Sequence, residues 1–225
     1  MKSPLIATPA GLLQLYFIRH GQTEWSLSGQ HTGRTDIPLT TRGEEEARQL
    51  GPRLRTVTFS RILTSPLLRA RRTCELAGLE PTVDIEPDLA EWDYGEYEGR
   101  TSPEIRKDQP GWNVFRDGCP GGESVAGVTL RADRLITRAT ALPGNVALFS
   151  SGQFGCSLAA RWIGLSILQA QHLLMSTASI SILAHNPAHP ELRVIAHWNH
   201  AASDPLGQLA FQEASTLIAN QEPDA

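Results

Sequence analysis

A unit of strand, turn and helix occurs three times in the sequence, and this alternation constrains the fold more than any other feature. The strands are short apolar runs over Leu12–Ile18, Arg61–Thr64 and Asn145–Ser150, and a polar turn follows each of them. Strands that alternate with helices are typical of α/β proteins. The sequence therefore predicts an α/β fold, a three-layer sandwich with a largely parallel sheet flanked by helices.

Capping signals predict where the helices begin and end. Thr41 followed by Glu44 forms a capping box that favours a helix over Arg42–Leu54. Ser65-Pro66 predicts the start of a second helix, which ends before Gly78. The other predicted elements are helices over Ser102–Asp108, Glu123–Ala141, Gly152–Ile163 and Gln169–Leu174, and strands over Ala178–Ala184 and Leu192–Trp198.

Length and composition fit one globular domain. The chain has 225 residues, of which 40% are hydrophobic, which is enough for one substantial core. We expect a single domain over residues 1–225, with its core at about 12–200 and a loosely ordered polar tail from about Gln212 to Ala225. The stretch from Pro81 to Gly122 is rich in Gly, Pro, Trp and Asp, and surface excursions of this length are often functional.

The charge and the cysteines exclude several classes of function. A formal net charge of -4 gives no global positive field, so we expect neither nucleic acid nor a membrane as partner. The three cysteines are widely spaced and lack a C-x-x-C pair, which fits a reducing, cytoplasmic location. No stretch approaches the ~20 apolar residues that span a bilayer. The expected partner is therefore a small molecule.

Polar side chains stand where the predicted strands end. Arg19 and His20 follow the first strand, Ser65 follows the second and Ser151 follows the third. Ligands of open α/β sheets bind outside the carboxyl ends of the strands, so these turns should converge. Arg69 lies one turn into the second helix, and the helix start after Ser151 adds a partial positive charge. The sequence thus predicts an anion site in which two arginines form a phosphate fork around His20.

Four segments resemble the motifs of one family, in the same order. Phe17–Thr23 reads FIRHGQT and is similar to the R-H-G-x-[ST] signature of the histidine phosphatase superfamily, which includes the cofactor-dependent phosphoglycerate mutases. Thr64–Ala70 resembles its second arginine segment, Leu89–Gly95 its acid segment and Leu148–Gly152 its late S-H-G segment. The resemblance extends from about residue 15 to 198 and implies a phosphoglycerate mutase-like fold.

Shorter segments are most similar to the branch that contains fungal sedoheptulose bisphosphatase. These are Gln30–Asp36, Trp112–Cys119 and Gly121–Glu123. The resemblance implies a phosphomonoesterase for a small phosphorylated metabolite, such as a sugar phosphate, with a site that also suits a phosphate or sulfate anion. The residues expected at the substrate are Gln22, Thr23, Ser26, Thr32, Gly33, Tyr94, Arg116, Ser124 and Gly152.

The mechanism of the family assigns roles to four side chains. By resemblance, His20 attacks phosphorus and becomes a phosphohistidine, while Glu91 protonates the leaving oxygen and later activates water. Arg19 and Arg69 hold the phosphoryl oxygens, where positioning and charge stabilisation provide most of the catalysis. This scheme requires no metal and no cofactor.

Ser151 departs from the family pattern, because most members carry a second histidine at that position. Loss of one preorganised hydrogen-bond donor predicts a rate deficit of roughly 10²–10³ fold. Gln153 and Cys156 also stand where relatives often carry histidine and arginine. The sequence leaves open a slow phosphatase, a phospho-ligand-binding protein without turnover and, third, a mutase-type transferase. A homodimer also stays open.

Some of these residues have simpler interpretations. Glu91 could be an ordinary exposed carboxylate. Arg116 could grip a second phosphate, or it could pair with Asp117. A zinc site is a weak alternative for the histidines of the C-terminal third, because no Cys or acidic residue completes a recognisable spacing. Those histidines are His185, His189, His197 and His200.

Overall fold

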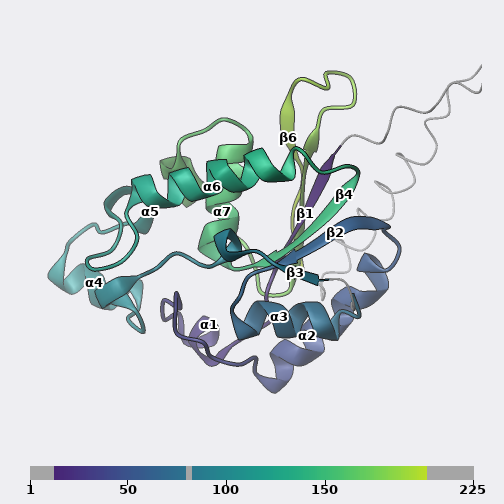
Figure 1. Ribbon diagram of the computed structural model, residues 1–225. Coiled ribbons are helices and arrows are strands. Elements are labelled where there is room, and N and C mark those ends of the chain that lie inside the picture. The colour runs from purple at the N-terminus through teal and green to yellow at the C-terminus, as the bar shows by residue number, and fades with distance from the viewer. Residues whose placement is uncertain (1–12, 80–82, 202–225) are drawn as a thin grey trace, which may run out of the picture.

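The computed structural model describes residues 13–79 and 83–201, and its strands form one six-stranded sheet. The strands are β1 (Gln14–Arg19), β2 (Phe59–Thr64), β3 (Val83–Ile85), β4 (Asn145–Ser150), β5 (Ser179–His185) and β6 (Arg193–Ala201). Their order in the sheet is β3-β2-β4-β1-β5-β6 (Figure 1). The pairings β3–β2, β2–β4 and β4–β1 are parallel, whereas β5 is antiparallel to both β1 and β6.

The predicted α/β architecture with a largely parallel sheet is confirmed, and β5 is the one described strand that runs against the others. The three strands of the repeated unit, β1, β2 and β4, are neighbours and run in the same direction. The two predicted closing strands exist as β5 and β6, and they are antiparallel to each other because a short hairpin connects them. With three residues, β3 is too short to produce a periodic signal in the sequence.

Helices cover both faces of the sheet, which gives three layers (Figure 1). The α-helices are α1 (Glu24–Ser28), α2 (Thr41–Leu54), α3 (Leu68–Leu76), α4 (Ser102–Asp108), α5 (Val114–Asp117), α6 (Val125–Ala139) and α7 (Gly152–Trp162). Short 3-10 helices are η1 (Pro87–Leu89), η2 (Gly95–Tyr97) and η3 (Ile167–His172). Helices α2 and α3 pack on one face of the sheet, and α6 and α7 pack on the other.

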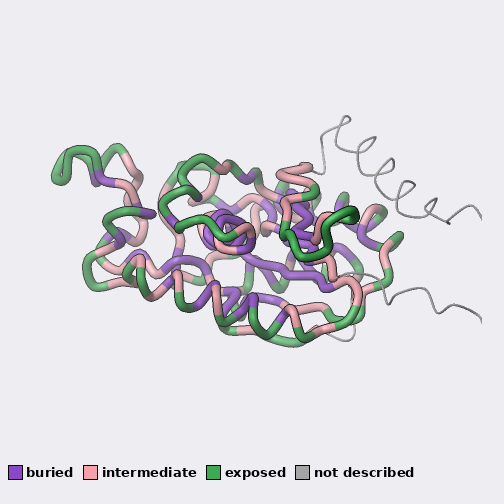
Figure 2. The backbone as a smooth tube through the Cα atoms, turned by 90° about the horizontal axis from the view of Figure 1, so that it is seen from above, coloured by how far each residue is buried: buried purple, intermediate pink, exposed green. Residues whose placement is uncertain are grey.

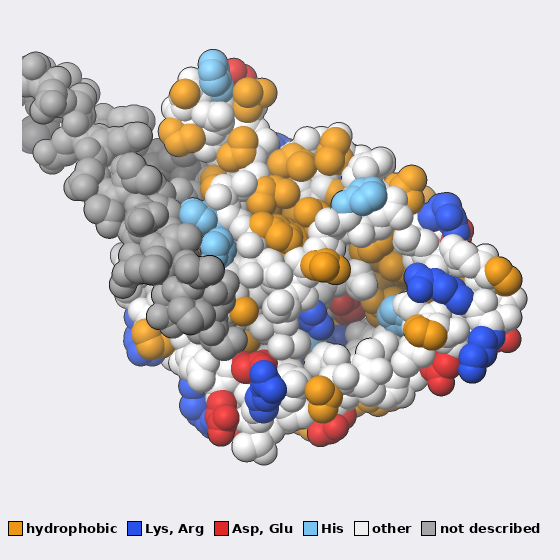
Figure 3. Space-filling model, turned by 180° about the vertical axis from the view of Figure 1, so that it is seen from behind, with side chains coloured by type: hydrophobic (Ala, Val, Ile, Leu, Met, Phe, Trp, Pro, Cys, Tyr) orange, Lys and Arg blue, Asp and Glu red, His pale blue; other side chains and the backbone are white. Residues whose placement is uncertain are grey.

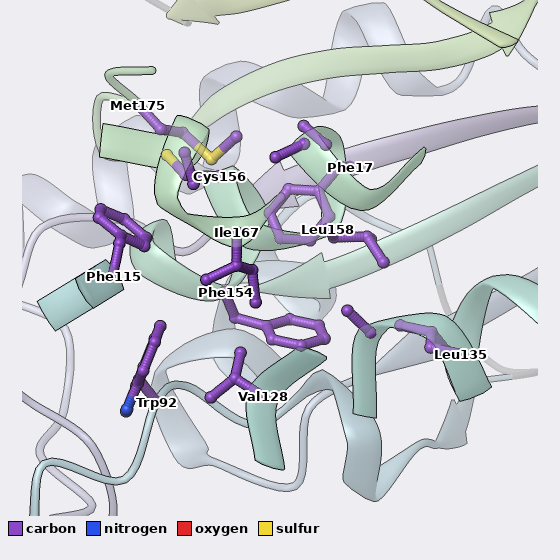
Figure 4. Close-up of a cluster of buried hydrophobic side chains, with 14 of the residues drawn as sticks. Phe17, Trp92, Phe115, Val128, Leu135, Phe154, Cys156, Leu158, Ile167 and Met175 are labelled. Carbon is purple, nitrogen blue, oxygen red and sulfur yellow. The ribbon is translucent and has the colours of Figure 1, made fainter. Parts of the chain in front are cut away.

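The core follows from the alternation of apolar residues along β1. Leu15 and Phe17 join the cluster beneath α6 and α7, whereas Tyr16 and Ile18 join the cluster beneath α2 and α3. Figure 4 shows part of the first cluster, in which Phe17 and Phe154 lie among aliphatic side chains. The central strands β1, β4 and β5 are among the most buried parts of the chain (Figure 2). Full burial of one side chain of this size contributes about 2–3 kcal/mol, so both faces of β1 hold its carboxyl end firmly.

Four predicted helix starts differ from the observed ones by one or two residues, including those of α6, which begins at Val125, and η3, which begins at Ile167. Helix α2 begins at Thr41, and Thr40 caps it by accepting a hydrogen bond from the N–H of Gly43 (3.0 Å). Two adjacent threonines both suit a cap, so the sequence signal is ambiguous. Helix α3 begins at Leu68, because Ser65 stays in the turn after β2, where its N–H donates to a β4 carbonyl (2.9 Å). The predicted bounds of α4 and β4 are confirmed.

Three further expectations concern the ends of the chain, membrane-spanning helices and a zinc site. The first residue of the predicted N-terminal strand, Leu12, and the predicted polar tail from about Gln212 lie outside the described residues. Among the helices that are described, none has the length and apolar character needed to cross a bilayer. Within 13–79 and 83–201, no three His, Cys, Asp or Glu side chains are grouped so as to hold a metal ion, which argues against the zinc alternative.

Gly43 provides a test of the contact between α2 and the turn after His20. A Cβ on Gly43 would lie 2.1 Å from the carbonyl oxygen of Gln22, a backbone atom that cannot easily move. We expect Gly43→Ala to lower the free energy of unfolding by about 2–3 kcal/mol. Gly127→Ala is the matched control, because it stands at the same position of α6 and would meet only the Glu123 side chain at 3.2 Å.

Urea denaturation measures both variants, and alanine at an open helical position stabilises by up to about 1 kcal/mol. Equal unfolding free energies for the two variants would contradict the close approach at Gly43.

Candidate active site

The three predicted turns meet at one edge of the sheet, because β2, β4 and β1 are adjacent and parallel. The N–H of His20 donates to Ser150 at the end of β4 (3.0 Å), and the N–H of Ser65 donates to Phe149 (2.9 Å). Arg19 pairs with Ser150 in the register of β1 and β4. Ladder hydrogen bonds thus fix the backbone beneath the site, as expected for strand ends of an α/β sheet.

His20 is held as a neutral, oriented imidazole. The side chain is 4% exposed, and Nδ1 lies 2.7 Å from the carbonyl oxygen of Gly21. A carbonyl only accepts, so Nδ1 carries the proton and Nε2 keeps its lone pair. Burial, and after it the charges of Arg69 and Arg19, lower the pKa of His20 well below its usual value of 6.5. This form of the ring is suited to nucleophilic attack.

Two guanidinium groups flank the imidazole, that of the fully buried Arg69 and that of Arg19, which is half-buried and lines the cleft. Arg69 has no exposed surface, and its Nη atoms donate to the carbonyls of Thr32 (3.0 Å), Gly33 (2.9 Å) and Thr35 (3.1 Å). Arg19 donates through Nη1 to the Met175 carbonyl. Burial lowers the pKa of both arginines, and the carboxylate of Glu91 opposes this shift.

The Nε atoms of Arg19 and Arg69 have no hydrogen-bond partner among the described residues, although both are buried. Unsatisfied buried donors of this kind are costly, so they indicate a place for an anion. Gly152 permits the position of Arg19, because a Cβ there would lie 3.2 Å from the guanidinium carbon.

Glu91 is buried, at 8% exposure, so it is not the exposed carboxylate of the simpler interpretation. Its Oε1 accepts from the N–H groups of Trp92 (2.8 Å) and Phe154 (2.7 Å), and its Oε2 accepts from the N–H of Gln153 (3.0 Å). Glu91 therefore caps α7 in place of the side chain of Ser151. The sequence predicts that the start of α7 contributes to an anion site. The N–H groups of Gln153 and Phe154 already donate to Glu91 instead.

Arg131 holds the segment that carries Glu91. Its guanidinium donates to the carbonyls of Asp88 (2.9 Å) and Ala90 (2.6 Å) and forms an ion pair with Glu123 (2.6 Å). The same group lies 4.2 Å from the ring centroid of Phe154 on α7. Arg131 thus connects the acid segment to the helix that Glu91 caps.

Ser151 is the N-cap residue of α7, and its hydroxyl makes no capping hydrogen bond. The side chain is 1% exposed, and Oγ has no partner within the described parts of the chain. A buried hydroxyl without a partner can donate one hydrogen bond to an added ligand. Among the described site residues, a buried polar atom without a hydrogen-bond partner thus occurs in Ser151, Arg19 and Arg69.

A cleft of about 320 Å³ opens above this arrangement, at the low end of volumes for small-molecule sites. Figure 3 shows the molecule hollowed on this face, with basic, acidic and histidine side chains inside the hollow. Of the residues predicted from the sequence, the cleft is lined by Arg19, His20, Ser26, Thr32, Glu91, Tyr94 and Gly152.

The other predicted residues lie behind or beside the cleft. Thr23 caps α1 and Ser124 caps α6. The side chain of Gln22 accepts from Thr40 (3.0 Å), and Gly33 offers its carbonyl to Arg69. Three more remain, of which Ser151 and Arg69 are buried. Arg116 is exposed and pairs with Asp117 (2.8 Å), the second of the two alternatives left open by the sequence.

Several lining residues were not among the predicted contacts. His31 is the most informative, because its ring stacks on Tyr94 (4.5 Å between centroids) and burial lowers its pKa to about 4. Its position within the segment Gln30–Asp36 is the one signal that could have identified it. Residues 173–175 follow η3, far from the four motifs in sequence, and no local pattern marks them. The other unpredicted lining residues are Trp25, Gly29, Gln30, Ser102, Gln153 and Cys156.

Comparison with known proteins agrees with this geometry. The model of the histidine phosphatase superfamily (branch 1) matches residues 15–198. An acid phosphatase of Mycobacterium tuberculosis is 38% identical over 191 residues, which are 83% of this chain and 94% of that protein. Sedoheptulose 1,7-bisphosphatase of Saccharomyces cerevisiae is 38% identical over 184 residues, 67% of each chain. A solved structure of an open reading frame product of Mycobacterium tuberculosis superimposes with a TM-score of 0.78 at 36% identity, covering 84% of this chain and 98% of that chain. The resemblance inferred from the motifs is confirmed.

The lowered pKa of His20 predicts a pH dependence of stability. Above about pH 6.5 the imidazole is neutral in both the folded and the unfolded state, so folding does not change the number of protons that it binds. Below that value the unfolded chain binds a proton that the folded protein does not, so stability falls as the pH falls towards the folded pKa, by up to about 1.4 kcal/mol per pH unit. We expect His20→Gln to lose less stability between pH 7.5 and 5.5 than the wild type.

Urea unfolding at both pH values measures the difference. His189→Gln is the control, because that histidine is exposed, with 63% of its side chain accessible. An unchanged pH dependence in His20→Gln would show that His20 takes up its proton in the folded state.

Proposed function

This chain belongs to the histidine phosphatase superfamily, branch 1, and is a histidine-type phosphatase; from that premise we propose that it hydrolyses the ester of a small phosphorylated metabolite through a phosphohistidine at His20. The observation that carries the proposal is the pair of buried, unpartnered guanidinium Nε donors beside a neutral imidazole. Phosphoryl transfer depends mainly on positioning and on charge stabilisation, and this arrangement provides both.

The proposed reaction has two steps. Nε2 of His20 forms a bond to phosphorus while the bond from phosphorus to the ester oxygen breaks. Glu91 takes the acidic proton of the monoanionic ester and passes it to the departing oxygen. In the second step Glu91 takes a proton from water, whose oxygen bonds to phosphorus as the bond to His20 breaks. Arg19 and Arg69 hold the phosphoryl oxygens throughout, and Tyr94 stays neutral because burial raises its pKa.

Ser151 makes the proposed enzyme slow. In the family pattern a histidine at this position supplies an additional cationic donor to the phosphoryl group. The hydroxyl of Ser151 supplies one neutral hydrogen bond at most. The difference corresponds to a deficit of about 10²–10³ fold in kcat.

The same observation favours a second candidate, a protein that binds a phosphorylated ligand and does not turn it over. Both candidates use the same arginines, and they differ only in whether His20 becomes phosphorylated. A sugar phosphate is the metabolite class that we propose from the resemblance, since one relative is named sedoheptulose 1,7-bisphosphatase. A cytoplasmic location, a homodimer and a mutase-type transfer stay predictions of the sequence.

Hydrolysis of 4-nitrophenyl phosphate separates the two candidates. We expect slow turnover by the wild type, none by His20→Ala and about 10²-fold faster turnover by Ser151→His. Ser151→Ala is the matched control, because it removes the hydroxyl without adding a donor, and it should be slower than the wild type. Rapid quench followed by mass spectrometry should detect phosphate on His20. Equal rates for the wild type and His20→Ala would exclude catalysis and favour the binding protein.

Arg131 is proposed as a positioning residue for Glu91. Removal of its donors frees the carbonyls of residues 88 and 90 and leaves Glu123 without its ion pair. We expect Arg131→Met to lower kcat about 10-fold or more with little change in KM, since a small displacement of a catalytic group is costly. Arg131→Lys should recover part of the rate.

The control is Arg134→Met, which removes another arginine of α6. The side chain of Arg134 is 55% accessible and pairs with Asp88 of η1. The variant should leave kcat within about twofold, because an exposed arginine contributes little and Arg138 also pairs with Asp88. Equal losses of kcat in the two methionine variants would mean that Arg131 acts only through stability.

A further inference from the structure

The cleft beyond the phosphate site is built from segments that the proposed chemistry does not use. One wall comes from α1 and the chain after it, including Trp25 and His31, and Ser102 at the start of α4 adjoins it. The other wall comes from the chain after η3, where residues 173–175 lie. The leaving group of any ester bound at His20 must lie between these walls, so they determine which leaving groups fit.

The charges that line the cleft are confined to the phosphate end. Among its described lining residues, Arg19 is the single arginine, no lysine occurs, and Glu91 is the single carboxylate. His31 carries no charge near pH 7, because burial lowers its pKa to about 4. A second anionic group on the substrate would therefore find no opposite charge along these walls.

Apolar side chains form one wall of the cleft and part of the other. Leu174 is 80% exposed, and Leu173 and Met175 continue this side of the cleft. The other wall contributes Trp25, which packs over Gly99, where a Cβ would lie 3.1 Å from the indole ring. An exposed leucine is an unfavourable surface in water, and contact with an apolar ligand removes it from water.

The polar groups of the wall formed by the chain after α1 and by Ser102 already have hydrogen-bond partners within the protein. Nε2 of His31 lies 3.0 Å from Oγ of Ser102, and the amide of Gln30 donates to the Gly99 carbonyl (2.7 Å). The hydroxyl of Thr32 donates to the backbone of Gln30 (3.3 Å). Because these groups satisfy one another, the wall demands few hydrogen bonds from the ligand.

We infer that the substrate is a phosphomonoester with an uncharged leaving group that presents an apolar or aromatic face, and that bisphosphates and phosphorylated carboxylic acids are poor ligands. This inference rests on the proposed function, since it assumes that the phosphate lies at His20. It separates this chain from the relative named for a bisphosphate substrate, and it favours a less polar leaving group than the sugar phosphate that the resemblance suggests. An unpaired charge held against uncharged walls is strongly disfavoured, so the second anion lowers affinity.

Arg106 is the cation outside the lining that bears on this inference. It is exposed on α4, its Nε donates to the Trp112 carbonyl (3.0 Å), and its charge contributes to the lowered pKa of His31. A long substrate could reach this group. Arg106→Gln is therefore included in the test.

The test compares 4-methylbenzyl phosphate with 4-carboxybenzyl phosphate, which have the same shape and similar leaving-group alcohols. We expect kcat/KM to be about 30-fold lower for the carboxylated ester, corresponding to about 2 kcal/mol. Leu174→Arg should raise kcat/KM for the carboxylated ester about 10-fold by adding a cation to the wall. The control is Leu192→Arg, an equivalent change at a leucine that is 51% exposed and does not line the cleft.

Equal or faster turnover of the carboxylated ester by the wild type would overturn the inference, as would a response to Leu192→Arg equal to that of Leu174→Arg. A third outcome would also overturn it: the wild type hydrolyses both esters at nearly equal kcat/KM, and Arg106→Gln lowers kcat/KM for the carboxylated ester about 30-fold. Arg106 would then be a site for the second anion. If neither ester is hydrolysed, the proposed catalysis fails, and calorimetry with the two esters decides this inference separately. Tighter binding of 4-methylbenzyl phosphate would support it, and equal binding would overturn it.

Discussion

Two guanidinium groups buried beside a neutral imidazole are the constraint on which the site depends. Arg69 is fully buried, and carbonyls from residues 32–35 surround its Nη atoms. That loop is held in turn by Glu98, which accepts from the N–H groups of Gly33 (2.7 Å) and Thr35 (3.0 Å). Arg69 donates its hydrogen bonds to neutral carbonyls, and the carboxylates of Glu91, Asp36 and Glu98 only partly offset its burial, which still lowers its pKa. An anion between the guanidinium groups therefore relieves the cost of their burial. Burial, and after it the two cations, lowers the pKa of His20 and keeps the imidazole unprotonated.

A second group of interactions fixes the acid segment on the opposite side. Glu91 accepts three backbone N–H groups, two of them from the first turn of α7. Arg131 ties the carbonyls before Glu91 to α6 and contacts Phe154. The start of α7 is therefore capped by a carboxylate from another segment, which leaves the hydroxyl of Ser151 available to a ligand. The cap of α7 and the proposed proton transfer use the same carboxylate, so the position of Glu91 and the start of α7 depend on each other.

The phosphate end of the site could be predicted from sequence because its residues follow strands. A strand end in a parallel sheet has a defined location, so Arg19 and His20 were found by local pattern alone. The edge strand β3 and the antiparallel direction of β5 depend on long-range pairing, which apolar periodicity does not encode. The two walls of the cleft beyond the phosphate end were missed for a related reason. One wall is the chain after α1 and the other is residues 173–175, which are about 145 residues apart and have no shared motif. Similarly, only the fold reveals that Glu91 caps α7.

The formal charge of the site relates the replacement of a cationic side chain by Ser151 to the lack of charged side chains along the walls of the cleft. With His20 neutral, Arg19 and Arg69 contribute two positive charges and Glu91 one negative charge, which leaves a formal excess of one. A phosphate monoester carries about -1.5 to -2 at pH 7, so the bound ester already exceeds this excess. A cationic side chain in place of Ser151 would close the difference, and the hydroxyl does not. Because the phosphate end cannot neutralise even one dianion, a second anionic group on the same ligand would add to an uncompensated negative charge. Walls without charged side chains are consistent with a proposed phosphate pocket that has one cation fewer.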